Sequence, residues 1–455
     1  MNYDSIGMSG RHVLVMGLGL HGGGAGTVEF LARAGAAVTV TDMRSARDLA
    51  PTLKSLRHLR GIRYVLGRHR DEDFLAADLI VKNPGVSPDS PYLRLARERG
   101  IPVTSDVGIF FRACPAPIIG VTGTRGKSTT TYLIWLLLKT KLGRRVHYGG
   151  NIRKSVLALL PHIKKNDHVV LELSSFQLQD LAAEKISPHS AVFTNLLRDH
   201  LNRHKDMREY ADAKSVIFRF QKPGDLFFYN AADPAVRRLA ARAPVRGGVR
   251  AVSPLSDSLG AAVDKNLGSH YRTSVALAVA VARQAGIPSD TVSKILRDWH
   301  GLPGRQEILA GKGGVLFVND TTATIPDAAI AAIRRFRAMA GPDHRLILIA
   351  GGQDKKLDFR AMAGEIKKSV DTLVLLPGTA TDALRLLLSG ATMSDASDMT
   401  SALRTALDAA HKGDIVLLSP GAASFGLFLN EFDRGDQFVR AIALRRGKTK
   451  NIRQE

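Results

Sequence analysis

The sequence predicts an α/β protein of three domains, each built on parallel strands that end in glycine-rich or small polar turns. Apolar runs of strand length alternate with longer runs that lack glycine and proline, which is typical of parallel sheets with helical crossovers. The chain has 455 residues, enough for about three domains of roughly 150 residues. Turns of this kind cluster in three separate stretches, so we set the domains at 1–112, 113–305 and 306–455.

The first stretch predicts a Rossmann-like fold. A strand at residues 12–16 leads into Gly17-Leu-Gly-Leu-His-Gly-Gly-Gly24, followed by a helix at 28–34 and a strand at 37–41 that Asp42 closes. Alone, this glycine spacing with Asp42 would favour NAD. The same geometry suits any nucleotide diphosphate at a helix N-terminus, so both ligands stay open. A strand at 79–81 then leads into the tight turn Asn83-Pro-Gly-Val86.

The central stretch carries the most informative motif, Gly120-Val-Thr-Gly-Thr-Arg-Gly-Lys-Ser-Thr-Thr130, between a strand at 117–121 and a helix at 129–142. The glycines let backbone N–H groups converge on a phosphate, Lys127 would reach the outer phosphates, and Ser128 would bind Mg²⁺. Only two residues separate Gly123 from Gly126, so the loop is shorter than the common form. We predict a P-loop ATPase-type parallel sheet, with a purely structural glycine turn as the alternative.

Further strands of the central stretch bring polar side chains to the same sheet edge. The strand at 168–173 carries Glu172 and the strand at 191–195 precedes His200, so both are candidates to hold Mg²⁺ beside Ser128. Lys214 lies on a helix at 206–220, with Tyr210 one turn earlier on the same face. Taken alone, Lys214 is better interpreted as a solvated helix lysine.

The third stretch predicts a second Rossmann-like domain. Strands at 315–319, 345–350, 372–376 and 414–418 each run into a turn. These turns offer Asp320 for a nucleotide or substrate and Lys355 and Ser424 for a carboxylate.

Composition limits the cellular setting. Hydrophobic residues make up 45% and charged residues 23% of the chain, and no apolar run approaches the roughly 18 residues of a membrane helix. The single cysteine, Cys114, excludes an intramolecular disulfide, so we expect a cytoplasmic protein without membrane insertion. The net charge of +22 would allow nucleic-acid binding. Because no long basic block occurs, we expect a generally basic surface and no specific nucleic-acid partner.

Read together, the motifs resemble the Mur ligase family, and within it the D-glutamate-adding branch, over nearly the whole chain. Besides the two glycine-rich turns above, the matching motifs are Gly149-Gly-Asn-Ile152, Glu172-Leu-Ser-Ser-Phe-Gln-Leu178, Asp199-His200, Tyr210-x-x-x-Lys214, Gly301-Leu-Pro-Gly-Arg305, Asn319-Asp320, Gly351-Gly-Gln-Asp-Lys355, and Ser419-Pro-Gly-Ala-Ala-Ser-Phe425 with Asp433-Arg-Gly435.

The resemblance implies a role for each group of site residues. The UDP of a muramoyl substrate would be held by Leu18, Gly19, Leu20, His21, Asp42, Arg44, Asn83, Pro84 and Gly85. ATP would be held by Gly123, Thr124, Gly126, Lys127, Ser128, Thr129, Arg305 and Asp320. Two Mg²⁺ ions would be held by Ser128, Glu172, His200 and a carbamylated Lys214, and the catalytic group would be Lys127, Glu172, His200 and Lys214. The muramoyl part would contact Asn151 and Ser174, and the amino acid Thr324, Lys355, Ser424 and Phe425.

The implied activity is an ATP-dependent ligase that adds D-glutamate to UDP-N-acetylmuramoyl-L-alanine through an acyl phosphate, as a monomer, in peptidoglycan synthesis. A ligase of this type for another amino acid, such as L-glutamate, or for another acceptor is the nearest alternative. A basic nucleic-acid-binding P-loop ATPase is more distant, and an NAD oxidoreductase would leave the phosphate loop unexplained. The chain departs from the family pattern at Arg125, Gly304, Thr322 and Tyr271, where relatives often have asparagine, histidine, lysine and asparagine.

Overall fold

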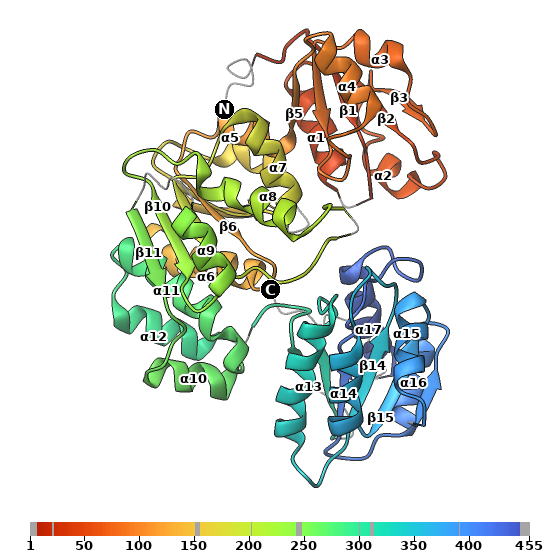
Figure 1. Cartoon of the computed structure of the whole chain (residues 1–455). Coiled ribbons are helices and arrows are strands. Elements are labelled where there is room, and N and C mark those ends of the chain that lie inside the picture. The colour runs from red at the N-terminus through yellow and green to blue at the C-terminus, as the bar shows by residue number, and fades with distance from the viewer. Residues whose placement is uncertain are drawn as a thin grey trace. The chain divides into compact units, whose positions relative to one another are not determined.

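The computed structural model describes residues 7–20, 22–150, 155–201, 203–242, 248–299, 301–309, 314–390 and 392–445. By their contacts these residues fall into two compact units. Unit 1 lies within Met1–Leu197, Asp206–Ala262 and Tyr271–Arg297, and unit 2 lies within Arg198–Lys205, Val263–His270 and Asp298–Glu455. Unit 1 contains two of the three sheets and unit 2 contains the third (Figure 1). Three α/β sheets confirm the predicted fold class, whereas the boundaries at 112 and 305 stay predictions.

The first sheet of unit 1 is parallel and has the order β3-β2-β1-β4-β5. Its strands are β1 (His12–Met16), β2 (Ala37–Asp42), β3 (Arg63–Leu66), β4 (Leu79–Lys82) and β5 (Val103–Ser105). The helices of this part are α1 (Gly23–Arg33), α2 (Ala50–Ser55), α3 (Asp71–Leu75), α4 (Pro91–Glu98) and α5 (Asp106–Ala113). Alternate residues of β1 enter different apolar clusters, Val13 and Val15 on one face and Leu14 and Met16 on the other. Because the strand order reverses between β1 and β4, a ligand crevice is expected at their carboxyl ends.

The second sheet of unit 1 is also parallel, with the order β11-β10-β9-β6-β8-β7. Its strands are β6 (Ile118–Thr122), β7 (Val146–Gly150), β8 (His168–Glu172), β9 (Ser190–Phe193), β10 (Leu226–Asn230) and β11 (Gly248–Val252). The α-helices are α6 (Lys127–Leu142), α7 (Ser175–Glu184), α8 (Met207–Arg219), α9 (Pro234–Arg242), α10 (Ser258–Asn266), α11 (Arg272–Gln284) and α12 (Ser289–Asp298), and the 3₁₀ turns are η2 (Gly143–Arg145), η3 (Val156–His162) and η4 (Ser269–Tyr271).

The three strands predicted for the central stretch, at 117–121, 168–173 and 191–195, are confirmed as β6, β8 and β9 within two residues at either end. The edge strands β7 and β11 were not predicted. Each has exposed positions and glycine in place of a continuous apolar run, as Tyr148 and Gly149 illustrate in β7. Pairing with a neighbouring strand stabilises such segments. This pairing cannot be recognised from the order of apolar residues along the chain.

The sheet of unit 2 has the order β12-β13-β17-β14-β15-β16. Its strands are β12 (Glu307–Leu309), β13 (Leu316–Asn319), β14 (Leu346–Gly351), β15 (Thr372–Leu376), β16 (Met393–Asp395) and β17 (Ile415–Leu418), with helices α13 (Pro326–Ala340), α14 (Arg360–Ser369), α15 (Thr379–Leu387), α16 (Met399–Asp408) and α17 (Glu431–Arg445). Helices α13 and α14 cover one face of this sheet and α16 and α17 the other (Figure 1). The short strand β12 runs antiparallel to β13, which the sequence did not predict.

No helix in the described part of the chain is long and apolar enough to cross a membrane.

Candidate functional site

The loop between β6 and α6 has the geometry of a phosphate-binding loop. Gly126 precedes the first turn of α6 with φ +77°, and Gly123 has φ +146°. A Cβ on Gly123 would lie 1.9 Å from Thr194 Oγ1, and one on Gly126 would lie 2.6 Å from Ser274 Oγ. Both positions therefore require glycine, for backbone angle and for space. The loop opens onto the N-terminus of a 16-residue helix, where backbone N–H groups and the helix dipole favour an anion.

Residues at the end of β9 fix the backbone of this loop. The Arg125 N–H donates to Asn195 Oδ1 at 2.8 Å, and the Arg125 carbonyl accepts from Thr194 Oγ1 and Asn195 Nδ2. The Thr124 N–H donates to the Asn195 carbonyl at 2.9 Å. The predicted strand at 191–195 ends at Asn195, but the sequence did not reveal that the amide of Asn195 holds the loop.

A hydroxyl and a carboxylate meet where the sequence predicts a magnesium site. Ser128 Oγ donates to Glu172 Oε2 at 2.5 Å, and Glu172 is only 3% exposed. Lys127 Nζ donates to the Thr124 carbonyl at 3.0 Å, so its ammonium lies at the same loop. The described residues contain no cluster of three or more His, Cys, Asp or Glu side chains that could hold a metal ion. This donor set fits Mg²⁺, which at nucleotide sites takes few protein ligands and completes its shell with phosphate oxygens and water.

Lys214 is buried, so its interpretation as a solvated lysine was wrong. The residue is 2% exposed, and its Nζ donates to the Gly123 carbonyl at 2.8 Å. The ammonium lies 4.7 Å from the centre of the Tyr210 ring, and the Tyr210 hydroxyl lies 3.3 Å from Thr124 Oγ1. The sequence predicted the shared face of Tyr210 and Lys214, but not that α8 packs this face against the phosphate loop.

The first sheet places Asp42 beneath the glycine-rich turn that follows β1. Its carboxylate accepts from the N–H groups of Leu18 (2.8 Å), Gly19 (3.1 Å) and Arg44 (2.9 Å). Leu18 is completely buried in the core, and a Cβ on Gly24 would lie 2.1 Å from its carbonyl oxygen. Asp42 and Leu18 therefore shape the turn, while Gly19, Leu20 and the exposed Arg44 remain the candidates for direct ligand contact.

The turn after β4 packs against the turn after β1. Asn83 Oδ1 accepts from the Gly85 N–H at 2.9 Å, and a Cβ on Gly17, which has φ +90°, would lie 3.0 Å from Asn83 Cβ. The structure thus brings together the two turns that the sequence assigned to one substrate, with Pro84 and Gly85 at the surface of the second turn.

Ser174 has a structural role that its motif conceals. Its side chain accepts from the Gln177 N–H, while Gln177 Oε1 accepts from the Ser174 N–H, which makes a capping box at the start of α7. The cap anchors α7 directly after Glu172. His21 and Asn151, which the sequence also assigned to substrate, lie outside the described residues.

In unit 2, the loops after β13, β14 and β17 are connected at one edge of the sheet. The Gly421 N–H donates to the Ala323 carbonyl at 2.9 Å, and Gln353 and Ala423 exchange backbone hydrogen bonds. Asp320 accepts from Ser419 Oγ at 2.8 Å and from the Gln306 N–H at 3.1 Å.

The residues predicted to hold the amino acid belong to these three connected loops. They are Thr324 after β13, Lys355 after β14, and Ser424 and Phe425 after β17. Ser424 is buried and Phe425 is 54% exposed.

The segment with His200 belongs to unit 2 by its contacts, although the sequence assigned it to the central domain. Lys355 Nζ lies 4.0 Å from Asp199 Oδ1, and His200 Nε2 lies 3.6 Å from Asp199 Oδ2. The structure therefore groups Asp199, His200 and Lys355 within unit 2, whereas Lys127, Ser128, Glu172 and Lys214 lie together in unit 1.

Two of the positions that depart from the pattern of the resembled family contact each other. Gly304 has φ +72°, and its carbonyl accepts from Thr322 N (3.1 Å) and Thr322 Oγ1 (3.0 Å). A Cβ on Gly304 would lie 3.0 Å from Thr321 Cγ2. A larger residue at 304 would therefore be strained, and Thr322 uses its hydroxyl to hold this turn next to Arg305. Arg305 itself lies in unit 2 and is half-buried.

Sequence reasoning gave no role to Lys82, Asp180 or Arg434. Lys82 Nζ lies 2.6 Å from Asp180 Oδ1, and both side chains are 6% exposed. Arg434 is completely buried in unit 2. Lysine at the end of an apolar strand and arginine in the first turn of an amphipathic helix were available signals, but their partners lie far away in the chain.

Comparison with protein families gives three matches that cover most of the chain. The family models are "Mur ligase MurD-like, N-terminal domain" at residues 11–105, "Mur ligase middle domain" at 121–273, and "Mur ligase, glutamate ligase domain" at 304–421.

Curated proteins and solved structures give matches of the same kind. A UDP-N-acetylmuramoylalanine--D-glutamate ligase from Roseiflexus sp. (strain RS-1) is 42% identical, covering 96% of this chain and 99% of the relative. One of the same name from Symbiobacterium thermophilum is 36% identical, covering 94% and 97%. In fold, the chain resembles UDP-N-acetylmuramate-alanine ligase from Thermotoga maritima, with a TM-score of 0.61, 17% identity and coverage of 96% and 100%. It also resembles MurF ligase from Thermotoga maritima in complex with ADP, with a TM-score of 0.57, 17% identity and coverage of 96% and 99%.

Proposed function

This chain belongs to the Mur ligase family, and from that premise we propose that it is an ATP-dependent ligase that adds D-glutamate to UDP-N-acetylmuramoyl-L-alanine in peptidoglycan synthesis. The names of its relatives, up to 42% identical over nearly full length, support the substrates. The structural observation that carries the proposal is the phosphate loop with Ser128 and Glu172 2.5 Å apart and Lys214 buried beneath it.

The substrate with the UDP group binds at the crevice of the first sheet. The turn after β1, held open by Asp42, leads into the N-terminus of α1, which suits a diphosphate. The exposed Arg44 adds a positive charge beside it, and the turn at Asn83 closes the other side of the crevice. The glycine spacing that resembles an NAD site therefore serves a uridine diphosphate.

The first chemical step joins the substrate carboxylate to the γ-phosphorus of ATP and releases ADP. Lys127 and the N-terminus of α6 stabilise negative charge on the phosphates, which offsets the repulsion between a carboxylate and the triphosphate. Ser128 and Glu172 hold Mg²⁺, which supplies charge neutralisation and polarises phosphoryl oxygens when bound. Thr124 lies in the phosphate loop and Thr129 in the first turn of α6, and both are proposed to contact ATP.

The second step forms the amide. The amine of glutamate attacks the carbonyl carbon of the acyl phosphate, and inorganic phosphate leaves. Lys355 provides a cation and Ser424 a hydroxyl for the carboxylates of the amino acid, with Thr324 and Phe425 on the adjacent loops. His200, Arg305 and Asp320 lie in unit 2; the proposed role of His200 is metal binding, and that of Arg305 and Asp320 is nucleotide binding.

A carbamylated Lys214 serves a second Mg²⁺. Addition of CO₂ to the amine replaces an ammonium by an anionic oxygen ligand, and Lys214 is buried against the phosphate loop, where such a ligand would face the nucleotide site. The reaction takes place in the cytoplasm with a monomeric enzyme, since the single cysteine fits a reducing compartment and one chain supplies every proposed ligand.

The test is phosphate release with the UDP-muramoyl-alanine nucleotide, ATP and a panel of amino acids that includes both enantiomers of glutamate. Turnover with D-glutamate alone is expected. Turnover with another amino acid would contradict the assigned substrate, and phosphate release stimulated by nucleic acid and not by amino acid would contradict the ligase. Lys127→Ala should abolish phosphate release while UDP-substrate binding, measured by calorimetry, is retained.

A further inference from the structure

Arg434 is a charged side chain with no contact to solvent. It lies in the first turn of α17 and is 0% exposed. Burial lowers its pKa from 12.5 to about 10, opposed by the nearby carboxylates of Glu431 and Asp320, so the guanidinium stays charged at neutral pH. Burying a charged group is costly unless its hydrogen bonds are made. A buried arginine is therefore expected to form hydrogen bonds that fix the segments around it.

The guanidinium connects two loops of the sheet edge. Nη2 donates to the Thr321 carbonyl at 2.7 Å, Nε donates to Thr321 Oγ1 at 3.2 Å, and Nη1 donates to the Ala422 carbonyl at 3.1 Å. Thr321 belongs to the loop after β13 and Ala422 to the loop after β17, two strands that pair in parallel. All three acceptors are neutral oxygens, and no carboxylate among the described residues forms an ion pair with this arginine. The planar guanidinium therefore fixes the distance between the two loops, and the single ammonium of a lysine cannot reproduce this set of hydrogen bonds.

The helix that carries Arg434 fits closely against the same loop. Thr321 Oγ1 donates to the Glu431 carbonyl at 2.6 Å. A Cβ on Gly435 would lie 2.5 Å from Thr321 Cγ2 and 3.2 Å from Asn319 Oδ1. Glycine at 435 is therefore what allows the first turn of α17 to approach the loop after β13 closely enough for Arg434 to reach both loops.

We propose that Arg434, with Gly435, is a positioning residue that fixes the spacing between the loop of Thr324 and the loop of Ser424, and thereby the site for the carboxylates of the incoming amino acid. This role rests on the proposed function, because it assumes that these two loops bind the amino acid. If this role is correct, loss of the Arg434 contacts should weaken amino-acid binding selectively. The turns for the UDP substrate and the phosphate loop should be unaffected, because they belong to unit 1.

The experiment compares steady-state kinetics of Arg434→Lys, Gly435→Ala and wild type in the full-length enzyme. Both variants should raise the KM for the amino acid by about tenfold or more, because a misplacement of about 1 Å can change rates by up to about a hundredfold. The KM for the UDP substrate should stay within twofold of wild type. Arg440→Met, on the same helix with its side chain 68% exposed, is the matched control and should match wild type.

The outcomes separate positioning from simple destabilisation. An unchanged amino-acid KM in folded variants, or an equal rise of all three substrate KM values, would overturn the proposal. If Arg434→Lys does not fold, Gly435→Ala, which keeps the arginine, carries the same prediction. A wild type inactive with every amino acid would contradict the proposed function, whereas an active wild type with unchanged variants contradicts the positioning role alone.

Discussion

Lys214 illustrates how far a single residue can depart from its sequence-based interpretation. Its spacing from Tyr210 predicted the shared helix face, but burial depends on what that face meets, here the Gly123 carbonyl at 2.8 Å. Phosphate-loop residues were predictable because glycine, lysine and serine in that order meet a local backbone requirement. The roles of Arg434 and Lys82 were not predictable, because Thr321, which accepts from Arg434, and Asp180, which pairs with Lys82, lie far away in the chain.

Lys214→Ala should reduce phosphate release by at least about a hundredfold, because it removes the precursor of the proposed metal-binding carbamate. Added bicarbonate should not restore this variant. In contrast, wild type depleted of CO₂ should lose activity and regain it when bicarbonate is added. The measurement is initial rate in degassed and bicarbonate-supplemented buffer at constant pH. A fully active Lys214→Ala variant, or a wild type indifferent to CO₂, would exclude an essential carbamate.

Asp106 predicts a pH dependence of stability. Desolvation is the main cause that raises the pKa of this buried carboxyl from 3.8 to about 6; Asp180 raises it further, while the hydrogen bond from the Val107 N–H and the charge of Lys82 oppose the shift. Between about pH 4 and 6 the native state therefore binds more protons than the unfolded state, and the free energy of unfolding falls as pH rises through this window. Above about pH 7 the full cost of roughly 3 kcal/mol is present.

Asp106→Asn removes this cost, so its stability relative to wild type should increase from pH 4 to pH 7 and then stay constant. Urea unfolding of both proteins across this range measures the difference. Asp212→Asn, whose side chain is 68% exposed, controls for the loss of one carboxylate. A stability difference that does not change with pH would show that Asp106 has the same affinity for protons in the folded and unfolded states.

At the scale of elements, α7 makes polar contacts with the first sheet and directly follows strand β8, which carries Glu172. Asp180 and Glu184 are four residues apart and share a face of α7. Asp180 pairs with Lys82 at the end of β4, and Glu184 accepts from Thr104 Oγ1 at 2.6 Å and from Arg112 at 2.5 Å. The start of α7 is fixed directly after Glu172 by its capping box. The sequence predicted strands β4 and β8, but not these polar contacts. Charged residues on a helix face are expected to be exposed to solvent, and the sequence does not show which of them a distant partner buries.

Lys82→Met should destabilise the protein by about 3–5 kcal/mol, since it leaves Asp180 buried without its cation. The double variant Lys82→Met with Asp180→Leu should recover most of this loss, because it removes both buried charges. It should still raise the KM for the UDP substrate, since Lys82 Nζ also lies 3.5 Å from the Val86 carbonyl in the turn that begins at Asn83.

Urea unfolding and substrate kinetics of the two single variants and the double variant measure both effects. The exposed pair Glu29–Arg33 on α1 serves as the control, and Arg33→Met should cost less than about 1 kcal/mol. If the double variant loses as much stability as the two single variants added together, the pair is not coupled, and the contribution of Lys82 comes from packing of its alkyl chain.

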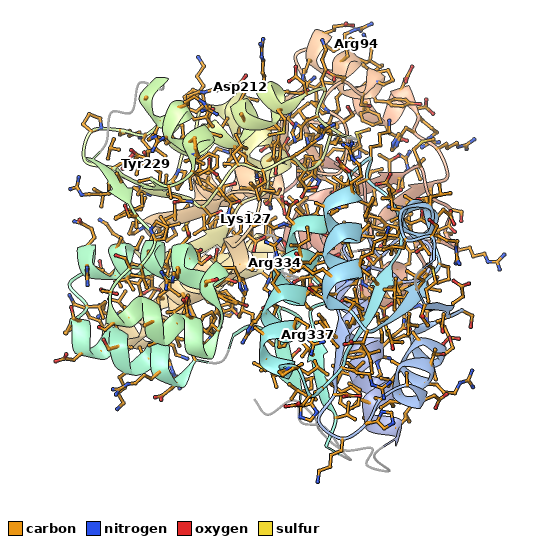
Figure 2. All side chains as sticks on the ribbon, turned by 60° about the horizontal axis from the view of Figure 1, so that its bottom comes forward. Arg94, Lys127, Asp212, Tyr229, Arg334 and Arg337 are labelled. Atoms are coloured by element: carbon orange, nitrogen blue, oxygen red, sulfur yellow. The ribbon has the colours of Figure 1, made fainter. Side chains whose placement is uncertain are left out.

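At the scale of the whole molecule, the net charge of +22 is not explained by the ligand sites alone. Basic side chains are distributed over elements of both units, as Arg94 on α4 and Arg334 on α13 illustrate (Figure 2). Such a distribution attracts polyanions over long distances but provides no ordered set of contacts to bases. The family relationship, and not the charge, identifies the reaction, which is why composition alone left a nucleic-acid-binding ATPase open.

The chain should therefore bind duplex DNA weakly, without sequence preference and with a steep dependence on salt. Counterion release at about six phosphate contacts would lower affinity by about a thousandfold between 50 and 200 mM salt. Fluorescence anisotropy should give the same binding curve for two unrelated labelled duplexes. Binding should no longer be detectable at about 0.2 M salt, where surface charges are screened beyond about 8 Å. Phosphate release measured in parallel should not respond to DNA at either salt concentration. Binding that survives high salt, or ATP turnover stimulated by DNA, would require an ordered nucleic-acid site. Either result would contradict the prediction that DNA binds only through nonspecific electrostatic attraction.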